Sequence, residues 1–482
     1  MSPTTIIFFI LAYFGILVIM GIITSRKANN LSFFIGNRKS PWYLVAFGMI
    51  GASLSGVTFL SVPGWVLTNK FFYMQMVMGY FMGYLVIVFV LLPIYYRMQL
   101  TSIYTYLNER YGKISYKTGA SLFLVSRLIG SAFRLFLVAN VLQLVVFDKI
   151  NVPFSMTVAL TLIFIWIYTF RGGIKTIVWT DTFQTFFMLL AVLLSVWYIV
   201  QSMDIGFFGA AKMIAKSEYG QVFDFSNWRS ESFFIKYFLS GAFITIVMTG
   251  LDQDMMQKNL SCRSLRDAQK NMLSYSAAFV PVNLLFLSLG ALLYIYASQN
   301  GILLPERTDD VFQHIAMNGY LPAIVGVLFI LGLIAAAYST ADSALTALTT
   351  SFLIDILGAG QMPEARLKRT RIIVHLGMSL MIALIIIVFN AFNNASVISS
   401  LFKAAGYTYG PLLAMFAFGI FSKRQIHEKY IPVLAIASPV AMFFLNKYSA
   451  ELFWGYKMGF EVLIYNAIIV LAGMFFLSYR KV

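Results

Sequence analysis

A run of small and polar residues interrupts an apolar segment in the second half of the chain. It extends from Ala335 to Ser343 and reads Ala-Ala-Ala-Tyr-Ser-Thr-Ala-Asp-Ser. At about 100° per residue, Ser339, Thr340 and Ser343 fall on one stripe of a helix, with Asp342 at its margin. Hydroxyl and carboxylate oxygens are hard ligands that suit a small cation such as Na⁺. Burying an ionisable residue in a membrane costs roughly 2.5–3.5 kcal/mol, so the patch predicts a functional cation site.

A second segment, near residues 42–68, is rich in residues that interrupt helices. Its small and helix-interrupting residues include Gly48, Gly51, Ser53, Ser55, Gly56, Thr58, Pro63 and Gly64. Relative to alanine, glycine costs about 1 kcal/mol and proline about 3 kcal/mol inside a helix, so we expect this segment to unwind. Unwound backbone at membrane depth is tolerated where it lines a cavity, and its free carbonyls can then coordinate an ion. Close helix packing is the alternative explanation, but the matching hydroxyl stripe favours an ion site.

The composition places both segments in a membrane protein. Of the 482 residues, 60% are apolar and only 11% are charged, whereas a soluble domain has about 25% charged residues. The one cysteine, Cys262, excludes an internal disulfide. A net charge of +16 could indicate a nucleic-acid partner, so the distribution of the basic residues has to be considered.

Thirteen apolar runs separated by charged turns predict thirteen membrane spans. They lie near 4–24, 42–68, 73–96, 119–147, 152–170, 177–202, 233–257, 272–298, 321–356, 372–391, 397–421, 430–446 and 459–479. The first run has no basic region before it, so it is expected to be a retained helix rather than a cleaved signal peptide.

The basic residues cluster on one side of these spans. The clusters lie at residues 26–39, 110–117, 258–270 and 366–371, and all of them are cytoplasmic if the N-terminus is outside and the C-terminus inside. The positive charge is therefore a topology signal. This explanation of the charge excludes nucleic acid as a partner, so membrane lipid is the expected macroscopic environment. The inferred orientation fits a bacterial inner membrane.

A long loop near residues 203–236 divides the spans into two halves. Five spans, 42–202, precede it and five, 233–421, follow it, with one extra helix at 4–24 and two at 430–479. The first span of each half is interrupted or followed by small and polar residues. The predicted fold is a single all-α polytopic transporter domain with an inverted repeat of five plus five helices.

Five motifs in chain order resemble those of the solute:sodium symporter family, which includes bacterial sodium-coupled transporters of galactose, proline and sialic acid. They are Gly51 to Gly56 with Pro63-Gly64, Arg171 to Gly173 followed by Trp179 to Gln184, Asp252-Gln253 with Gln257, Ala336 to Ser343, and Gly410-Pro411 leading to Gly419 and Lys423-Arg424. The resemblance covers nearly everything from about Phe33 to Arg424. It implies a leucine-transporter-type fold and secondary active Na⁺-coupled symport of a small solute by alternating access. Neither an enzymatic activity nor an organic cofactor is expected.

The resemblance also implies a main sodium site between the broken helix and the hydroxyl-bearing helix. Matched residue by residue, its carbonyls are those of Gly51, Leu54 and Ala336, and its hydroxyls are those of Ser339 and Thr340. Five neutral oxygens hold a monovalent ion without binding it too tightly, as a carrier requires.

Some relatives carry a second sodium site, which corresponds here to Asp181, Ser339 and Ser343. Asp342 stands where such relatives have a hydroxyl. Two carboxylates near one site either bind a cation more tightly or repel each other until one takes a proton. The sequence therefore allows either one or two Na⁺ ions per solute. It also allows Asp181 to be a capping or gating residue instead of a sodium ligand.

The solute is predicted from Arg134, which lies mid-span and must face the bundle or a wet cavity. Its fork of donors suits a carboxylate, and by resemblance it lies where an arginine of the sialic-acid transporters meets the substrate carboxylate. Ser53, Ser55 and Thr58 match polar residues that face that substrate, and Gln75 is an expected neighbour. We expect an organic anion such as a sialic acid, with a neutral sugar or amino acid as the alternative.

Other polar residues indicate less. Asp252 and Asp254 could suggest a Mg²⁺–phosphate site, but basic residues follow at once, which favours an ordinary inner loop. Arg127, one heptad before Arg134, could snorkel with it as a pair. The absence of a filter-like repeat disfavours a channel, and the absence of a catalytic cluster disfavours an enzyme. A membrane receptor for a solute is an alternative that the sequence leaves open. The sequence does not determine the oligomeric state, and it is compatible with a monomer.

Overall fold

The computed structural model describes all residues except 1–2, 26–29, 360–361, 393–396 and 480–482. The described chain is almost entirely helical, with a short antiparallel pairing of β1 (Gln425–Ile426) and β2 (Ser478–Tyr479). The helices are α1 (Pro3–Ser25), α2 (Asn30–Ile35), α3 (Trp42–Ser53), α4 (Gly56–Asn69), α5 (Tyr73–Val86), α6 (Leu92–Arg97), α7 (Thr105–Arg110), α8 (Lys113–Leu142), α9 (Phe154–Gly172), α10 (Ile174–Ser202), α11 (Phe207–Lys216), α12 (Phe234–Thr245), α13 (Gln253–Leu260), α14 (Leu265–Gln299), α15 (Val311–Met317), α16 (Ala323–Ser351), α17 (Glu364–Phe392), α18 (Val397–Phe421), α19 (Ile431–Lys447), α20 (Ser449–Leu452) and α21 (Val462–Phe476).

Helical segments of the described chain account for all thirteen predicted spans. Nine are helices long and apolar enough to cross a membrane, two are pairs of helices bent at a short break, and two are shorter apolar helices, Phe154–Ile167 and Val462–Phe476. The bent pairs are α3 with α4, at 54°, and α12 with α13, at 63°. Each bent pair corresponds to the first span of one of the predicted halves. The predicted all-α membrane fold is confirmed, while the half boundaries 42–202 and 233–421 stay predictions.

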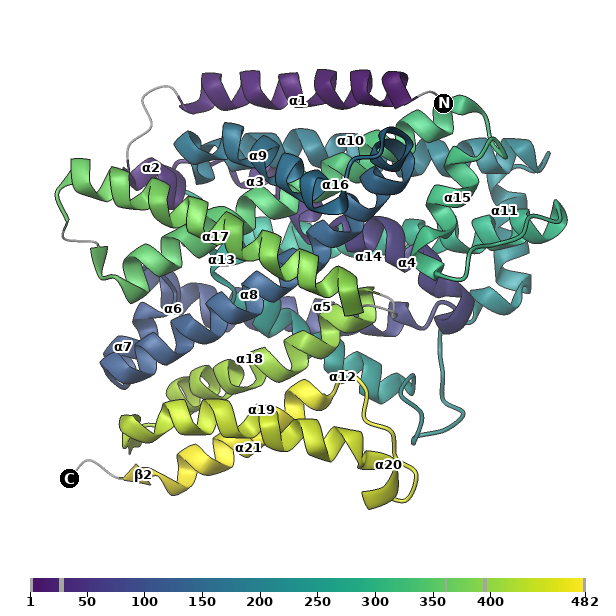
Figure 1. Ribbon diagram of the computed structural model, residues 1–482. Helices are drawn as coiled ribbons and strands as arrows, with labels where there is room; N and C mark the ends of the chain where they lie inside the picture. Colours follow the sequence, from purple (N-terminus) through teal and green to yellow (C-terminus); the bar gives the residue numbers. More distant parts are fainter. Residues whose placement is uncertain (1–2, 26–29, 360–361, 393–396, 480–482) are drawn as a thin grey trace.

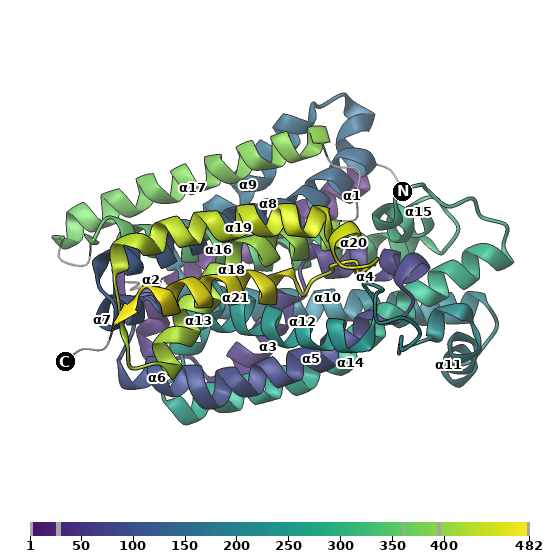
Figure 2. The ribbon, with the colours of Figure 1, turned by 90° about the horizontal axis from the view of Figure 1, so that it is seen from below.

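The helices lie side by side as an elongated bundle with the two chain ends at opposite ends of it (Figures 1 and 2). The N-terminal helix α1 lies along one face, against α9 and α10, and the C-terminal pair α19 and α21 lies along the opposite face, against α18 (Figure 1). Between these faces α16 packs against α10, α8 and α3. From Gly332 to Ser351 every residue of α16 is buried, so its hydroxyl stripe faces protein rather than lipid.

The break between α3 and α4 follows from its local sequence. Leu54 leaves the helical region with φ −82° and ψ 73°, and the hydroxyl of Ser55 restarts the chain as the N-cap of α4 by accepting the N–H of Val57 at 3.3 Å. Gly51 lets α3 approach α10 closely, because a Cβ there would lie 2.0 Å from Oγ1 of Thr185. The end of α3 that leads into the break is therefore packed closely against α10.

Candidate functional site

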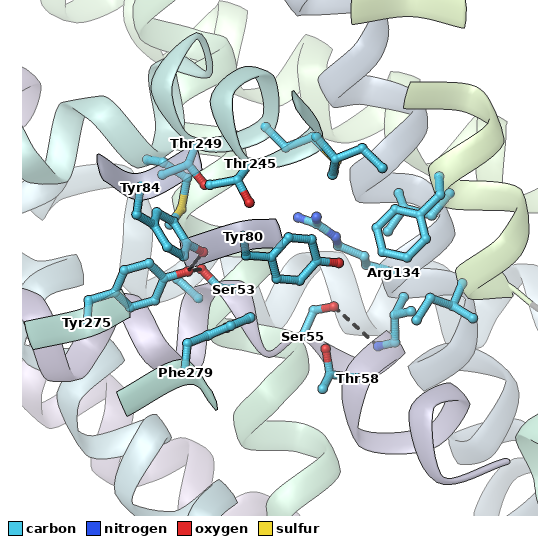
Figure 3. A pocket seen from close by; sticks show the side chains of 18 of the residues that line it. Ser53, Ser55, Thr58, Tyr80, Tyr84, Arg134, Thr245, Thr249, Tyr275 and Phe279 are labelled. Carbon is cyan, nitrogen blue, oxygen red and sulfur yellow. Dashed lines mark hydrogen bonds between the residues drawn. The ribbon is translucent and has the colours of Figure 1, made fainter. Parts of the chain in front are cut away.

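A cavity of about 80 Å³ opens beside the break between α3 and α4 (Figure 3). Ser53, Ser55 and Thr58 of the broken helix and Arg134 of α8 all line it. The structure thus brings together four of the five residues expected near a solute. The cavity is also lined by residues that the sequence does not predict, including Tyr73, Tyr80, Tyr84, Thr245, Thr249, Tyr275, Phe279 and Phe402.

The fifth residue, Gln75, does not face the cavity, which corrects the expectation that it neighbours the solute. Its amide group donates to the carbonyls of Phe72 and Ser232, at 3.3 and 3.1 Å, and accepts the N–H of Asp224 at 3.1 Å. The buried Gln75 side chain instead anchors the loop that precedes α12. Its place in the chain, two residues into α5, gives no sign of these loop partners.

Arg134 carries a guanidinium that the described residues leave without a partner. None of them forms an ion pair or hydrogen bond with it, and its buried Nε lacks an acceptor. In Figure 3 the side chain points into the cavity, toward the region between Tyr80 and Thr245. Removing a charge from water without pairing it is costly, so the cavity is electrostatically suited to an anionic group.

Arg127, by contrast, is neutralised by two acids. Asp252 and Asp254, expected in an ordinary inner loop, are fully buried at the break between α12 and α13. Arg127 forms an ion pair with Asp254 and lies 3.6 Å from the carboxylate of Asp252. Asp252 also caps α13 through the N–H of Asp254, at 2.9 Å, and accepts the hydroxyl of Tyr409 at 2.6 Å. The loop assignment and the snorkelling alternative for Arg127 are therefore wrong.

A chain of aromatic ring contacts leads from the cavity to Trp65 and Phe460, which line a second pocket beside the loop before α12. Tyr73 and Phe402, which line the cavity, have ring centroids 6.5 Å apart. Trp65 lies 6.0 Å from Tyr73, and Phe460 lies 5.2 Å from Phe402. The hydroxyl of Tyr275 donates to Ser53 at 2.6 Å, which fixes one polar group of the broken helix in the wall.

The hydroxyl-bearing stretch of α16 meets the same break from the other side. Thr340 Oγ1 donates to the carbonyl of Ala336 at 3.1 Å and lies 3.4 Å from the carbonyl oxygen of Ala52. The carbonyls of Gly51 and Leu54, on either side of this contact, accept no backbone hydrogen bond from the described residues. Two of the three backbone oxygens expected to bind sodium, those of Gly51 and Leu54, are thus among the carbonyls that the break leaves free, whereas the third, of Ala336, accepts the hydroxyl of Thr340.

This set of oxygens fits Na⁺. It combines neutral carbonyl and hydroxyl oxygens, the donors that hard cations prefer, and Ala336, Ser339 and Thr340 are at most 1% exposed. A buried carbonyl without a partner is costly, and a bound cation removes that cost. Ala52 joins the two sites, since it lines the solute cavity and its carbonyl faces Thr340.

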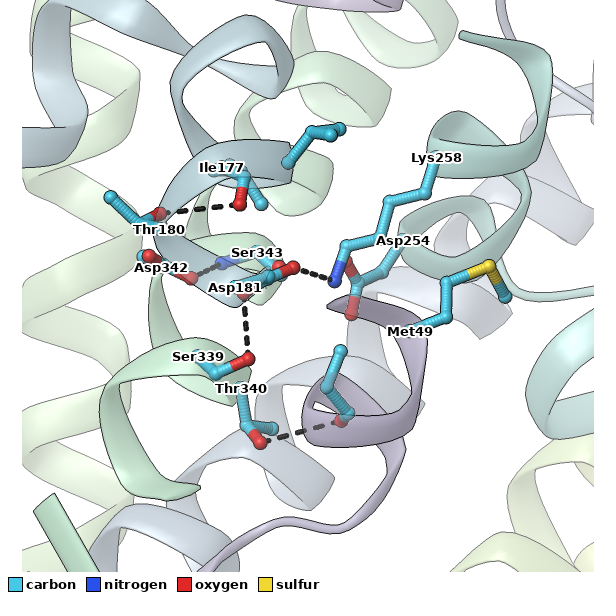
Figure 4. Close-up of polar contacts among 12 residues, drawn as sticks. Met49, Ile177, Thr180, Asp181, Asp254, Lys258, Ser339, Thr340, Asp342 and Ser343 are labelled. Carbon is cyan, nitrogen blue, oxygen red and sulfur yellow. Dashed lines mark hydrogen bonds and ion pairs between the residues drawn. The ribbon is translucent and has the colours of Figure 1, made fainter. Parts of the chain in front are cut away.

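Ser339 turns toward α10, where the predicted second-site residues lie together (Figure 4). Its hydroxyl donates to Oδ1 of Asp181 at 2.6 Å, and Asp342 accepts the N–H of Ser343 at 2.5 Å. The other carboxylate oxygen of Asp181 lies 2.7 Å from Nζ of Lys258 on α13, with both side chains 1% exposed. The sequence assigns Lys258 to an inner basic cluster and gives no sign of this buried ion pair.

Comparisons with known proteins agree with this architecture. Residues 33–428 match the Sodium:solute symporter family. The chain is 24% identical over 424 residues to the sodium/sialic acid symporter NanT of Aliivibrio fischeri, covering 86% of this chain and 82% of NanT. It is 27% identical over 406 residues to the sodium-dependent multivitamin transporter of Oryctolagus cuniculus, covering 80% of this chain and 61% of that protein.

Among solved structures, the substrate-bound outward-open state of a Na⁺-coupled sialic acid symporter aligns over 99% of both chains, with a TM-score of 0.82 and 19% identity. This match shows the fold, and a transporter called Mhp1 shares it more distantly, with a TM-score of 0.57 at 14% identity. The relatives are sodium-coupled transporters rather than enzymes, as the motifs predict. This integral membrane protein is a Na⁺-coupled solute symporter, and the chain belongs to the sodium:solute symporter family.

Proposed function

We propose that this symporter imports an organic solute bearing a carboxylate, together with Na⁺, across a bacterial inner membrane. In this proposal the N-terminus is outside and the C-terminus cytoplasmic, which the clustering of basic residues on one side of the spans supports. The observation that carries the proposal is the guanidinium of Arg134, to which the described residues offer no partner, in a cavity beside the helix break. At the same break the carbonyls of Gly51 and Leu54 accept no backbone hydrogen bond from that part of the chain.

The carboxylate end of the solute is assigned to Arg134. A guanidinium binds a carboxylate through two parallel charge-assisted hydrogen bonds, and no acid among the described residues forms an ion pair with Arg134, whose buried Nε lacks an acceptor. The hydroxyls of Ser55 and Thr58 line the same cavity and can complete the donors around a carboxylate. The related protein NanT is named for sialic acid, which is itself a carboxylate.

The rest of the solute is assigned a largely apolar body. Among the described residues that line the cavity there is no asparagine, glutamine, aspartate or glutamate side chain. Aromatic and aliphatic side chains dominate instead, and the hydroxyls of Tyr84 and Tyr275 lie 2.8 Å apart and satisfy each other. The hydroxyls of Ser55, Thr58, Thr245 and Thr249 in the lining can serve a few polar groups of the solute. The body is therefore proposed to be mainly aryl or alkyl, with few hydroxyls of its own, because each unpaired buried hydroxyl carries a cost.

Coupling follows from the shared break. Bound Na⁺ supplies the positive charge around which the carbonyls of Gly51, Leu54 and Ala336 and the hydroxyls of Ser339 and Thr340 converge. The carbonyls of Gly51 and Leu54 lie in the same stretch of chain as Ser53 and Ser55, which line the cavity. Fixing the break against α16 therefore fixes one wall of the solute site, and the ion favours the conformation that binds solute.

Uptake into proteoliposomes tests this function. With an inward Na⁺ gradient, we expect accumulation of an aryl or alkyl monocarboxylate but not of its primary amide, which matches it in size. An equal K⁺ gradient is the control for the ion. We expect Arg134→Gln to abolish saturable uptake.

Three results would contradict the proposal. Gradient-driven uptake of a neutral sugar or amino acid that survives Arg134→Gln would make the chain a neutral-solute symporter. Equilibration of solute without a gradient would indicate a channel. Solute binding without any uptake would indicate a receptor.

A further inference from the structure

Lys258 places an ammonium group inside the helix bundle, beside residues expected to hold a second sodium ion. Its Nζ lies 2.7 Å from Oδ2 of Asp181, and both side chains are 1% exposed. Within the described part of the chain, Asp181 is the one ion-pair partner of Lys258. The ammonium therefore acts as the counter-ion of this buried carboxylate.

A second sodium ion does not fit around Asp181 while the ammonium is there. One carboxylate oxygen accepts the hydroxyl of Ser339 at 2.6 Å, and the other contacts Lys258. A sodium ion bound to the same carboxylate would lie within a few ångströms of the ammonium, and two like charges at that distance in a buried site repel strongly. The neighbouring Asp342 carboxylate is engaged locally with the N–H of Ser343.

We propose that Lys258 is a tethered cation that takes the place of the second sodium ion at Asp181, so that the carrier couples one Na⁺ to each solute. The inference rests on the proposed function for the first ion only. Lys258 thereby determines the ion stoichiometry, and removing its ammonium while keeping Asp181 converts this locus into a sodium site.

The ion pair also makes the connection between helices that a bound ion would make. Lys258 belongs to α13, the second half of the broken helix that follows the long loop, whereas Asp181 belongs to α10. Through Ser339, Asp181 reaches α16, the helix that carries the main sodium site. A charge supplied by the chain itself thus links these three elements (Figure 4).

The number of bound sodium ions tests the proposal on purified protein without any transport. Equilibrium binding of radiolabelled Na⁺ should give one ion per chain for the wild type and two for Lys258→Met, which keeps the length and apolar stem of the side chain. The double variant Lys258→Met with Asp181→Asn should return to one ion, because the carboxylate that attracts the second ion is absent.

Thermal unfolding in Na⁺ and in K⁺ gives a second readout. Removing one partner of a buried ion pair leaves an uncompensated charge, so Lys258→Met should be stabilised by Na⁺ more than the wild type is. Arg127→Met is the matched control, since it uncovers the buried acid Asp254 without the hydroxyls of α16, and it should show no extra stabilisation by Na⁺.

Two results would overturn the proposal: two ions bound by the wild type, or one ion bound by a folded Lys258→Met. If Lys258→Met folds in neither salt, the wild-type ion count and the neutral double variant still decide, since the proposal requires one ion in each. The absence of any Na⁺ binding in the wild type would overturn the main sodium site, and the proposed function with it.

Discussion

Replacing Gly51 with alanine tests whether the geometry of the helix break sets the affinity for Na⁺. A Cβ at this position would lie 2.0 Å from Oγ1, 3.0 Å from Cβ and 3.2 Å from Cα of Thr185 on α10. Rotating the Thr185 side chain would relieve the first contact but not the other two. An ordinary contact begins at 3.4 Å, so α3 must move away from α10 by several tenths of an ångström, and by about 1.4 Å if Thr185 keeps its rotamer.

The structure sets the size of the effect. Inserting a methyl group into a packed interior costs about 1–3 kcal/mol, and binding groups must be held within about 0.5 Å of their working positions. Because the carbonyl of Gly51 is a proposed sodium ligand, a displacement of this size should weaken Na⁺ binding by about tenfold or more, which corresponds to about 1.4 kcal/mol. The unfolding temperature should fall as well.

Stabilisation against thermal unfolding, titrated with Na⁺, is a suitable assay. Gly377→Ala is the matched control, because no atom lies within 4 Å of a Cβ at that exposed helical position. Thr185→Ala removes the atom at 2.0 Å, so combining it with Gly51→Ala should restore most of the Na⁺ affinity. Wild-type Na⁺ affinity in Gly51→Ala would refute the argument that the close contact of α3 and α10 positions the ligand.

Three further outcomes are expected. Arg134→Lys keeps the positive charge but loses the forked pair of hydrogen-bond donors. The KM for solute should rise about tenfold, because one charge-assisted hydrogen bond is lost. An unchanged KM would show that Arg134 is not part of the solute site. With one Na⁺ per monoanionic solute, no net charge crosses the membrane, so uptake should not respond to an imposed voltage; a measured transport current would contradict one-ion coupling. In the loop before α12, burial opposes ionisation of Asp224, but hydrogen bonds from Ser226 and Ser232 outweigh it and hold the pKa of Asp224 below its ordinary value. The carboxylate therefore stabilises the fold above the unfolded pKa of about 3.9, and this contribution is lost as pH falls through the folded pKa. Asp224→Asn should lower the unfolding temperature more at pH 7 than at acidic pH, and equal effects at both pH values would disprove the assignment.

The elements of the fold are largely predictable because local sequence determines them. Long apolar runs define the spans, and the glycine- and serine-rich stretch ending at Ser55 produces a break at Leu54, where an N-cap restarts the helix. The burial of the polar stripe of α16 is also predictable, because hydroxyl residues such as Ser339 and Thr340 are unfavourable facing lipid.

The side-chain partners are less predictable because they depend on helix packing. Lys258 and Asp181 lie in different halves of the chain, and the position of Lys258 in a basic cluster fits a cytoplasmic loop equally well. Asp252 and Asp254 become buried because α12 ends in a sharp bend, which directs both carboxylates toward Arg127. No spacing rule connects residues across such a bend.

Direct binding of radiolabelled Na⁺ tests the central claim, that the break between α3 and α4 and the hydroxyls of α16 together hold the coupling ion. Thr340→Val removes a proposed ligand while keeping the shape of the side chain. Thr349→Val, on the same helix, removes a buried hydroxyl that bonds to the carbonyl of Leu345 at 2.6 Å and to Nδ1 of His375 at 2.9 Å, away from the break. We expect Na⁺ binding to be lost or greatly weakened in Thr340→Val and kept in Thr349→Val. Equal Na⁺ binding by Thr340→Val and the wild type would contradict the account.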